Sequence, residues 1–152
     1  MNFNIKLSQK QLYIILIFCS VIIFLNCIEV MINVKDIGLY EQWMDIAQKS
    51  NGYDDKDVDY YQLYLTNNLS HFFIKIIVPM ALGIYSYFVF KFTKINKIYV
   101  FTWTILLLGS LAFVVLERKF DSIFYYINIV CYIALIVTLL SLNKLIGNRG
   151  NS

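Results

Sequence analysis

Long apolar runs separated by polar segments make up most of this sequence. An α-helix needs roughly 20 apolar residues to cross about 30 Å of hydrocarbon, and four runs have this length: residues 12–32, 69–90, 98–116 and 122–142. Short connections join the last three runs, whereas residues 33–68 separate the first from the second. The pattern predicts an all-α integral membrane protein in which residues 1–152 form a single domain, a bundle of four transmembrane helices.

The polar segment 33–68 has a helical pattern of its own. Between Asp36 and Lys49, apolar and aromatic residues such as Trp43 recur on one side and charged residues on the other, which predicts an amphipathic helix. Residues 57–67 predict a short second helix that leads into the next span. The amphipathic helix would either cover the end of the bundle or present a docking face to a partner, and the sequence leaves both interpretations open.

Charged residues outside the apolar runs predict how the chain is oriented. The N-terminal tail, the 91–97 connection and the C-terminal tail carry lysine or arginine and no acid, whereas residues 33–68 hold seven acids against three lysines. The 117–121 turn is balanced. Because Lys and Arg are enriched in cytoplasmic segments, we expect a multi-pass protein of the plasma membrane with both termini in the cytoplasm and the 33–68 loop outside it.

The composition agrees with this class and argues against several others. Hydrophobic residues make up 59% of the chain and its mean hydropathy is +0.63, well above the values of a soluble domain. Frequent use of Lys over Arg, with many Ile, Asn, Tyr and Phe, is typical of an AT-rich bacterial genome. The three cysteines fall inside predicted spans and form no C-x-x-C pair, which argues against a disulfide framework or a zinc site.

The second apolar run carries polar residues at helical spacing. His71, Lys75 and Pro79 are four residues apart and share one face of a helix. A lysine near the middle of a membrane costs about 2.5 to 3.5 kcal/mol to insert, so Lys75 should have a partner unless it extends to the interface. Glu29, near the end of the first run, is the partner that we predict; the alternative is a carboxylate that simply meets water.

Helix depth groups further residues with this pair. At about 1.5 Å per residue from the helix ends, Asn26 and Asn128 fall close to the level of Glu29 and Lys75. We therefore predict a polar layer beneath the 33–68 loop, although close helix packing would also explain Asn128. The candidate residues for binding a partner are those of this layer together with one aromatic residue of the loop: Asn26, Glu29, His71, Lys75, Asn128 and Trp43.

The motifs of hydrolytic, nucleotide-binding and metal-dependent enzymes do not occur in the sequence. We expect no catalytic activity, no cofactor, no metal and no nucleic acid, and a surface that meets the lipid bilayer. The expected function is that of an interaction or accessory module, a membrane-complex subunit or an immunity-type factor, that engages another membrane or extracytoplasmic protein through the loop and the polar pocket. The alternative is a small carrier or channel subunit that forms a homo-oligomer and uses Glu29 and Lys75.

Overall fold

Five helices make up the computed structural model of the chain, which describes residues 7–51, 59–92, 95–117 and 122–148. The helices are α1 (Gln9–Lys35), α2 (Ile37–Asn51), α3 (Tyr60–Phe92), α4 (Lys97–Leu116) and α5 (Ile123–Asn148). All except α2 are long and apolar enough to cross a membrane. The prediction of an all-α chain with four membrane-length helices is confirmed.

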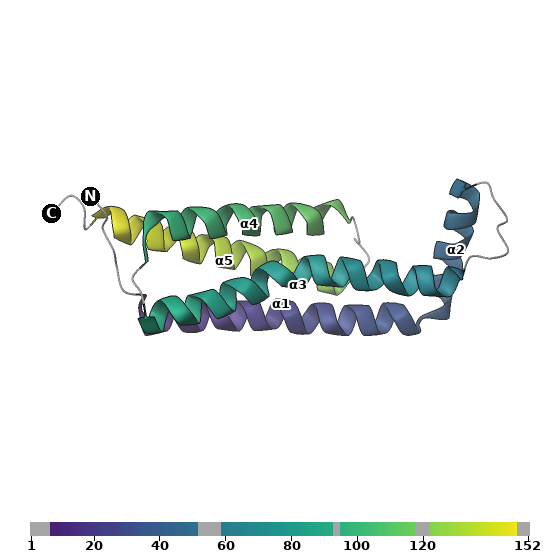
Figure 1. Ribbon diagram of the computed structural model, residues 1–152, viewed down its shortest axis with the longest axis horizontal. Coiled ribbons are helices and arrows are strands. Elements are labelled where there is room, and N and C mark those ends of the chain that lie inside the picture. Colours follow the sequence, from purple (N-terminus) through teal and green to yellow (C-terminus); the bar gives the residue numbers. More distant parts are fainter. Residues whose placement is uncertain (1–6, 52–58, 93–94, 118–121, 149–152) are drawn as a thin grey trace.

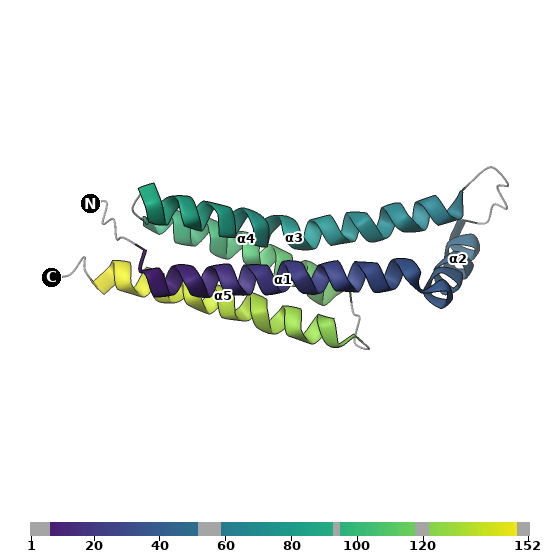
Figure 2. The ribbon, with the colours of Figure 1, turned by 90° about the horizontal axis from the view of Figure 1, so that it is seen from below.

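The four long helices lie side by side along one axis (Figures 1 and 2). α1 packs against α3 and α5, and α4 packs against α5 and α3. α1 begins and α5 ends at the same end of this bundle, and α2 crosses the opposite end, which we call the α2 end (Figure 1). α1 and α3 continue past the end of α4 toward α2, so this end of the molecule is built from fewer helices than the rest.

The helix boundaries extend beyond the predicted spans. α1 begins after Ser8, whose side chain forms a capping box with Gln11. α3 is a single helix from Tyr60 onward, so residues 60–67 of the short second helix predicted over 57–67 are the first part of the membrane-length helix, and residues 57 and 58 lie outside the described chain. Asp59 caps α3 by accepting from the backbone of Tyr61 and Gln62. No Gly or Pro interrupts this stretch, and α3 therefore projects beyond the predicted start at residue 69.

The predicted amphipathic helix is present as α2 and packs on α3 through aromatic rings. The Tyr40 ring lies 5.4 Å from that of Tyr64 and the Trp43 ring 5.5 Å from it. Tyr64 is buried, and its hydroxyl donates to the carbonyl of Asn33 at 2.7 Å. Ile46, which shares the predicted apolar side, is exposed, so α2 covers the end of the bundle only in part.

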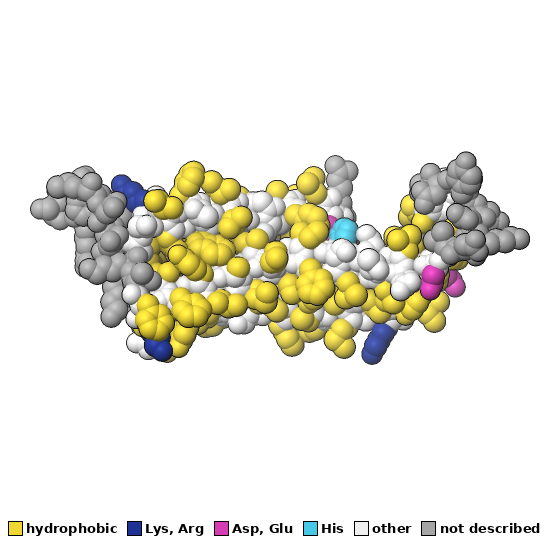
Figure 3. Space-filling view, viewed as in Figure 1, with side chains coloured by type: hydrophobic (Ala, Val, Ile, Leu, Met, Phe, Trp, Pro, Cys, Tyr) yellow, Lys and Arg dark blue, Asp and Glu magenta, His cyan; other side chains and the backbone are white. Residues whose placement is uncertain are grey.

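Aliphatic side chains fill the bundle away from the α2 end. Six of them, drawn from all four long helices, have no exposed surface: Ile15, Ile22, Leu82, Leu107, Leu135 and Leu139. The polar side chains buried there include Ser86 and Tyr99, whose hydroxyls are hydrogen-bonded at 2.7 Å. On the face shown in Figure 3, hydrophobic side chains also run along the outside of the bundle, as a helical protein in a bilayer requires.

Pro79 lies inside α3, and a neighbouring helix compensates for its missing backbone donor. Proline cannot donate to the carbonyl four residues earlier, which is that of Lys75. The Tyr132 hydroxyl of α5 donates to this carbonyl at 2.8 Å, and Tyr132 is fully buried. The ribbon of α3 changes direction near its middle (Figure 1), as helices containing an internal proline do. The tyrosine therefore satisfies the group that the proline leaves unpaired.

We predict that Tyr132→Phe destabilises the protein by about 1 to 3 kcal/mol, because it leaves a buried carbonyl without a donor. In a Pro79→Ala background the helix can supply an amide to the carbonyl of Lys75, so the same change should cost much less. Thermal unfolding in detergent measures both differences. Tyr126→Phe, at an exposed position of the same helix, is the matched control, and an equal cost of Tyr132→Phe in the two backgrounds would contradict the assignment.

Candidate functional site

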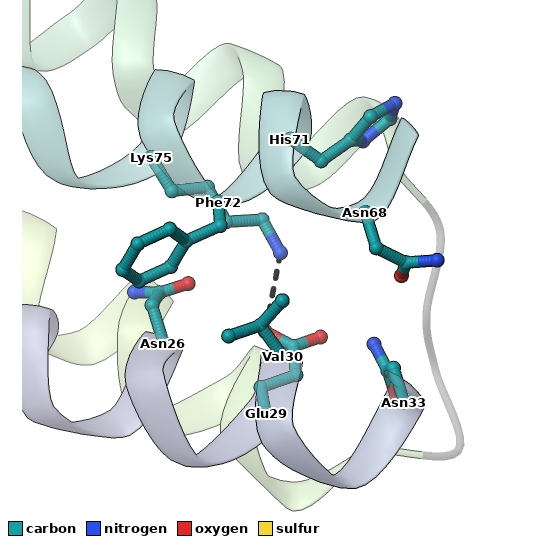
Figure 4. A pocket seen from close by; sticks show the side chains of 8 residues that line it. All are labelled: Asn26, Glu29, Val30, Asn33, Asn68, His71, Phe72 and Lys75. Carbon is teal, nitrogen blue, oxygen red and sulfur yellow. Dashed lines mark hydrogen bonds and ion pairs between the residues drawn. The ribbon is translucent and has the colours of Figure 1, made fainter. Parts of the chain in front are cut away.

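A buried cluster of ionisable side chains lies near the α2 end and joins three helices. Lys75 Nζ of α3 is 3.2 Å from Glu29 Oε2 of α1 (Figure 4) and 2.6 Å from Glu117 Oε2 at the end of α4. The three side chains are only 5%, 8% and 6% exposed. The predicted pairing of Lys75 with Glu29 is confirmed, and Lys75 is held between two carboxylates.

Glu117 was missed by the sequence analysis, which assigned it to a balanced turn. It directly follows α4, and it enters the site because α4 ends at the level of Lys75 while α1 and α3 continue. Its Oε1 also lies 2.8 Å from Nδ1 of His71. A carboxylate at the C-terminus of a helix is opposed by the helix dipole. That unfavourable position was the signal in the sequence that this acid requires a cation nearby.

A pair of buried amides lies beside the charged cluster. Asn26 Nδ2 donates to the backbone carbonyl of Ile22 at 2.7 Å and to Oδ1 of Asn128 at 3.3 Å, which links α1 to α5. Both asparagines are buried. The predicted polar layer therefore consists of two neighbouring groups, one ionic and one formed by amides, and Asn128 contacts Asn26 rather than the ions.

Two cavities meet at the charged cluster. The inner cavity has a volume of about 10 Å³, about that of one water-sized sphere, and Figure 4 shows the side chains around it. The outer cavity, which we call the vestibule, has a volume of about 490 Å³. The residues that line the vestibule come from α1, α2, α3 and the position just before α5: Glu29, Asn33, Leu39, Trp43, Tyr64, Asn67, Asn68, His71 and Ser122.

The vestibule opens between α2 and the end of α4. The surface in Figure 3 is hollowed there, and His71, the only histidine of the chain, lies at the edge of the hollow. Figure 4 shows Asn33 of α1 and Asn68 of α3 pointing toward one another where the two helices continue toward α2. Glu29 and His71 line both cavities, so the charged cluster contributes directly to the wall of the vestibule.

The structure thus separates the six predicted residues into three positions. Glu29, His71 and Lys75 belong to the charged cluster, Asn26 and Asn128 form the amide pair, and Trp43 lines the vestibule from α2. Asn33, Asn67 and Asn68 are further polar residues of the wall that the sequence analysis did not select.

No protein-family model, curated protein or solved structure matches this chain. Within the described part of the chain, no group of three or more His, Cys, Asp or Glu side chains is arranged to hold a metal ion. The open cavity is lined by two aromatic rings, a leucine side chain, amide groups, a serine hydroxyl, a carboxylate and an imidazole. Such a set of side chains is suited to binding a polar ligand or a partner's side chain.

Because Lys75 is shared by two carboxylates, exchanging the charges at positions 29 and 75 should not restore stability. Lys75→Met should destabilise the protein strongly, by about 3 to 5 kcal/mol, because two buried carboxylates lose their common cation. The double swap Glu29→Lys with Lys75→Glu should recover little, since it places a carboxylate at position 75 beside Glu117. Adding Glu117→Gln should therefore raise the melting temperature of the double swap, although the same change lowers that of the unaltered protein.

Melting temperatures in detergent measure the effect of Glu117→Gln, which should be opposite in sign in the two backgrounds. Glu41→Gln, at an exposed position of α2, removes a carboxylate outside the cluster and should have little effect in either background. If Glu117→Gln shifts the melting temperature in the same direction in both backgrounds, Lys75 and Glu117 are not coupled as the geometry implies.

Proposed function

We propose that this chain is an interaction module of a bacterial plasma membrane, either a subunit of a membrane complex or an immunity-type factor. It would engage another membrane or extracytoplasmic protein through α2 and the vestibule. One observation carries the proposal: amide groups, a carboxylate, an imidazole and the rings of Trp43 and Tyr64 line a 490 Å³ cavity at the α2 end, while the interior of the remaining bundle is mainly aliphatic. A protein that recognises a partner at one end needs polar and aromatic groups only at that end.

The charges of the chain support one orientation of the module in the membrane. The segments around α1's start and α5's end are basic, and residues 33–68, which include α2, carry seven acids against three lysines. The tendency of Lys and Arg to remain in the cytoplasm supports cytoplasmic termini and an extracytoplasmic α2. In this orientation the vestibule faces proteins outside the cell membrane, and α2 forms part of its wall.

A carrier or channel subunit is the alternative function, and buried ionisable residues within a membrane-length helix are its main support. The packing counts against a path through one copy. Glu29 and Lys75 are bound to each other, and fully buried residues such as Ile15 and Leu82 occupy the bundle beyond them. A path for ions would therefore have to run between copies of the chain in a homo-oligomer.

The orientation can be tested by labelling single cysteines in a background from which the three native cysteines have been removed. A membrane-impermeant maleimide applied to intact cells should label Gln48→Cys on α2. It should label Lys94→Cys, in the sequence between α3 and α4, only after the cells are opened. Labelling of Lys94→Cys and not of Gln48→Cys in intact cells would invert the topology and place α2 in the cytoplasm.

Photo-crosslinking in native membranes tests the proposed function itself. A benzophenone amino acid at Leu39, which lines the vestibule, should give one adduct with an unrelated protein at defined mass. The same amino acid at Phe101, which is exposed on α4 away from the α2 end, should not give this adduct. An adduct with the mass of two copies of this chain would favour the homo-oligomeric alternative, and the absence of a protein adduct at Leu39 would contradict the interaction module.

A further inference from the structure

We infer that the vestibule recognises a cation, the guanidinium or ammonium group of an arginine- or lysine-rich peptide segment. The inference rests on the proposed function in one respect, since it names the chemistry of the partner's segment that enters the cavity. Three independent features of the described residues support it: an aromatic wall, a set of oxygen acceptors, and an excess of acidic residues in the surrounding segment.

The aromatic wall is held in place by contacts between α2 and α3. Trp43 lines the vestibule, and its ring packs against that of Tyr64 with the centroids 5.5 Å apart and the planes inclined at 57°. Tyr64 is in turn fixed by Tyr40 and by its hydrogen bond to the carbonyl of Asn33. The face of an indole ring attracts a cation more strongly than that of any other side chain, and here the ring is fixed before a ligand arrives.

Oxygen atoms that can accept hydrogen bonds line another part of the cavity, beside the apolar surface of side chains such as Leu39. Asn68 donates its amide nitrogen to the carbonyl of Tyr64 at 3.0 Å, so its Oδ1 remains as an acceptor, and in Figure 4 this oxygen lies on the side toward α1. Asn33 and Asn67 add two amide groups and Glu29 a carboxylate. Guanidinium and ammonium groups are donors without acceptors, and this wall therefore complements them.

The charge around the vestibule favours a cation over an anion. The described parts of the segment 33–68, residues 33–51 and 59–68, hold four acids and two lysines, a formal charge of −2. Glu41 and Asp45 are exposed on α2, and Lys49, the lysine of that helix, is paired with Asp45 at 2.6 Å. The buried Lys75 does not reverse this charge because it lies between two carboxylates. An acidic surface of this kind attracts cationic ligands over about a Debye length, roughly 8 Å at physiological salt.

The size of the cavity suits a short segment of a partner. A volume of about 490 Å³ lies within the range of pockets that enclose drug-sized molecules. One long basic side chain with the backbone that carries it would fill such a space. The rest of a partner would then lie against α2, whose exposed surface includes Leu39 and Ile46.

The two tryptophans of the chain provide a direct test with an internal control. A Trp103→Phe protein retains Trp43 in the vestibule as its reporter, and a Trp43→Phe protein retains Trp103 on α4, which packs against the apolar core. Both are titrated with acetyl-tetra-arginine amide in a polyoxyethylene detergent, whose head group is uncharged. Circular dichroism verifies that both variants are helical.

We expect a saturable change in the emission of Trp43 and none in that of Trp103. Between 50 and 300 mM salt the apparent affinity should fall at least threefold, as for an interaction between opposite charges in water. Equilibrium dialysis of labelled tetra-arginine should show binding at least threefold weaker to Trp43→Phe than to Trp103→Phe, because the best cation-binding ring is lost.

Two further probes distinguish the other ligand classes. Tetra-glutamate should not bind, and a neutral oligosaccharide, maltotetraose, should not change the emission of Trp43. A saturable response to maltotetraose that equals the response to tetra-arginine and is independent of salt would overturn the inference in favour of an uncharged ligand. The absence of any response to tetra-arginine would also overturn it.

The outcome is separable from that of the proposed function. A protein adduct at Leu39 without tetra-arginine binding would leave the interaction module standing and remove the cationic specificity. Tetra-arginine binding without a protein adduct would leave a cation-binding vestibule and remove the interaction module.

Discussion

The buried ammonium group of Lys75 is the constraint on which the arrangement of the helices depends. A cation in a low-dielectric interior must be paired, and Lys75 is paired with Glu29 of α1 and Glu117 at the end of α4. The backbone of the same residue is tied to α5, because the carbonyl left free by Pro79 accepts from Tyr132. Residue 75 therefore holds its own helix to each of the other three long helices by a polar contact.

These polar contacts fix the vertical alignment of the helices more strictly than apolar packing does. Hydrocarbon tails are as apolar as leucine side chains, so helices in a bilayer gain no hydrophobic energy from a particular vertical alignment. A lysine that must meet two carboxylates and a carbonyl that must meet one hydroxyl are satisfied only when the helices stand at matching heights. That register places the end of α4 beside His71 and Lys75, while α1 and α3 continue toward α2. The vestibule is the space that this difference in helix height creates.

The sequence was sufficient to predict the helices and the pair at the centre of the cluster, but not the relative heights of the helices. His71, Lys75 and Pro79 could be placed on one face because helical spacing is a local property, and Glu29 followed because it is the acid inside the preceding run. Glu117 was missed because all four helices were assumed to end at the same level of the membrane. With that assumption a residue after the third span lies at the surface.

Two other features depended on tertiary contacts that periodicity does not contain. A proline inside a helix leaves a carbonyl in need of a donor, but which of the twelve tyrosines supplies it is decided by the packing of α5 on α3. The apolar side of α2 was visible in the sequence, yet Trp43 packs on Tyr64 while Ile46 is exposed. α2 packs on only one edge of α3, so part of the apolar side of α2 remains exposed. Because α2 covers the end of the bundle only in part, the vestibule remains open.

The link between the vestibule and the charged cluster bears on how a ligand would affect the protein. Glu29 and His71 both line the cavity, and both belong to the network around Lys75, Glu29 directly and His71 through Glu117. A cation that binds the carboxylate of Glu29 would compete with Lys75 for it. The ion pair between α1 and α3 would then weaken, and Lys75 would be paired mainly with Glu117. Because these ion pairs help set the helix heights, a cation bound in the vestibule as inferred above would be thermodynamically coupled to the alignment of α4, and each would influence the other by the same free energy.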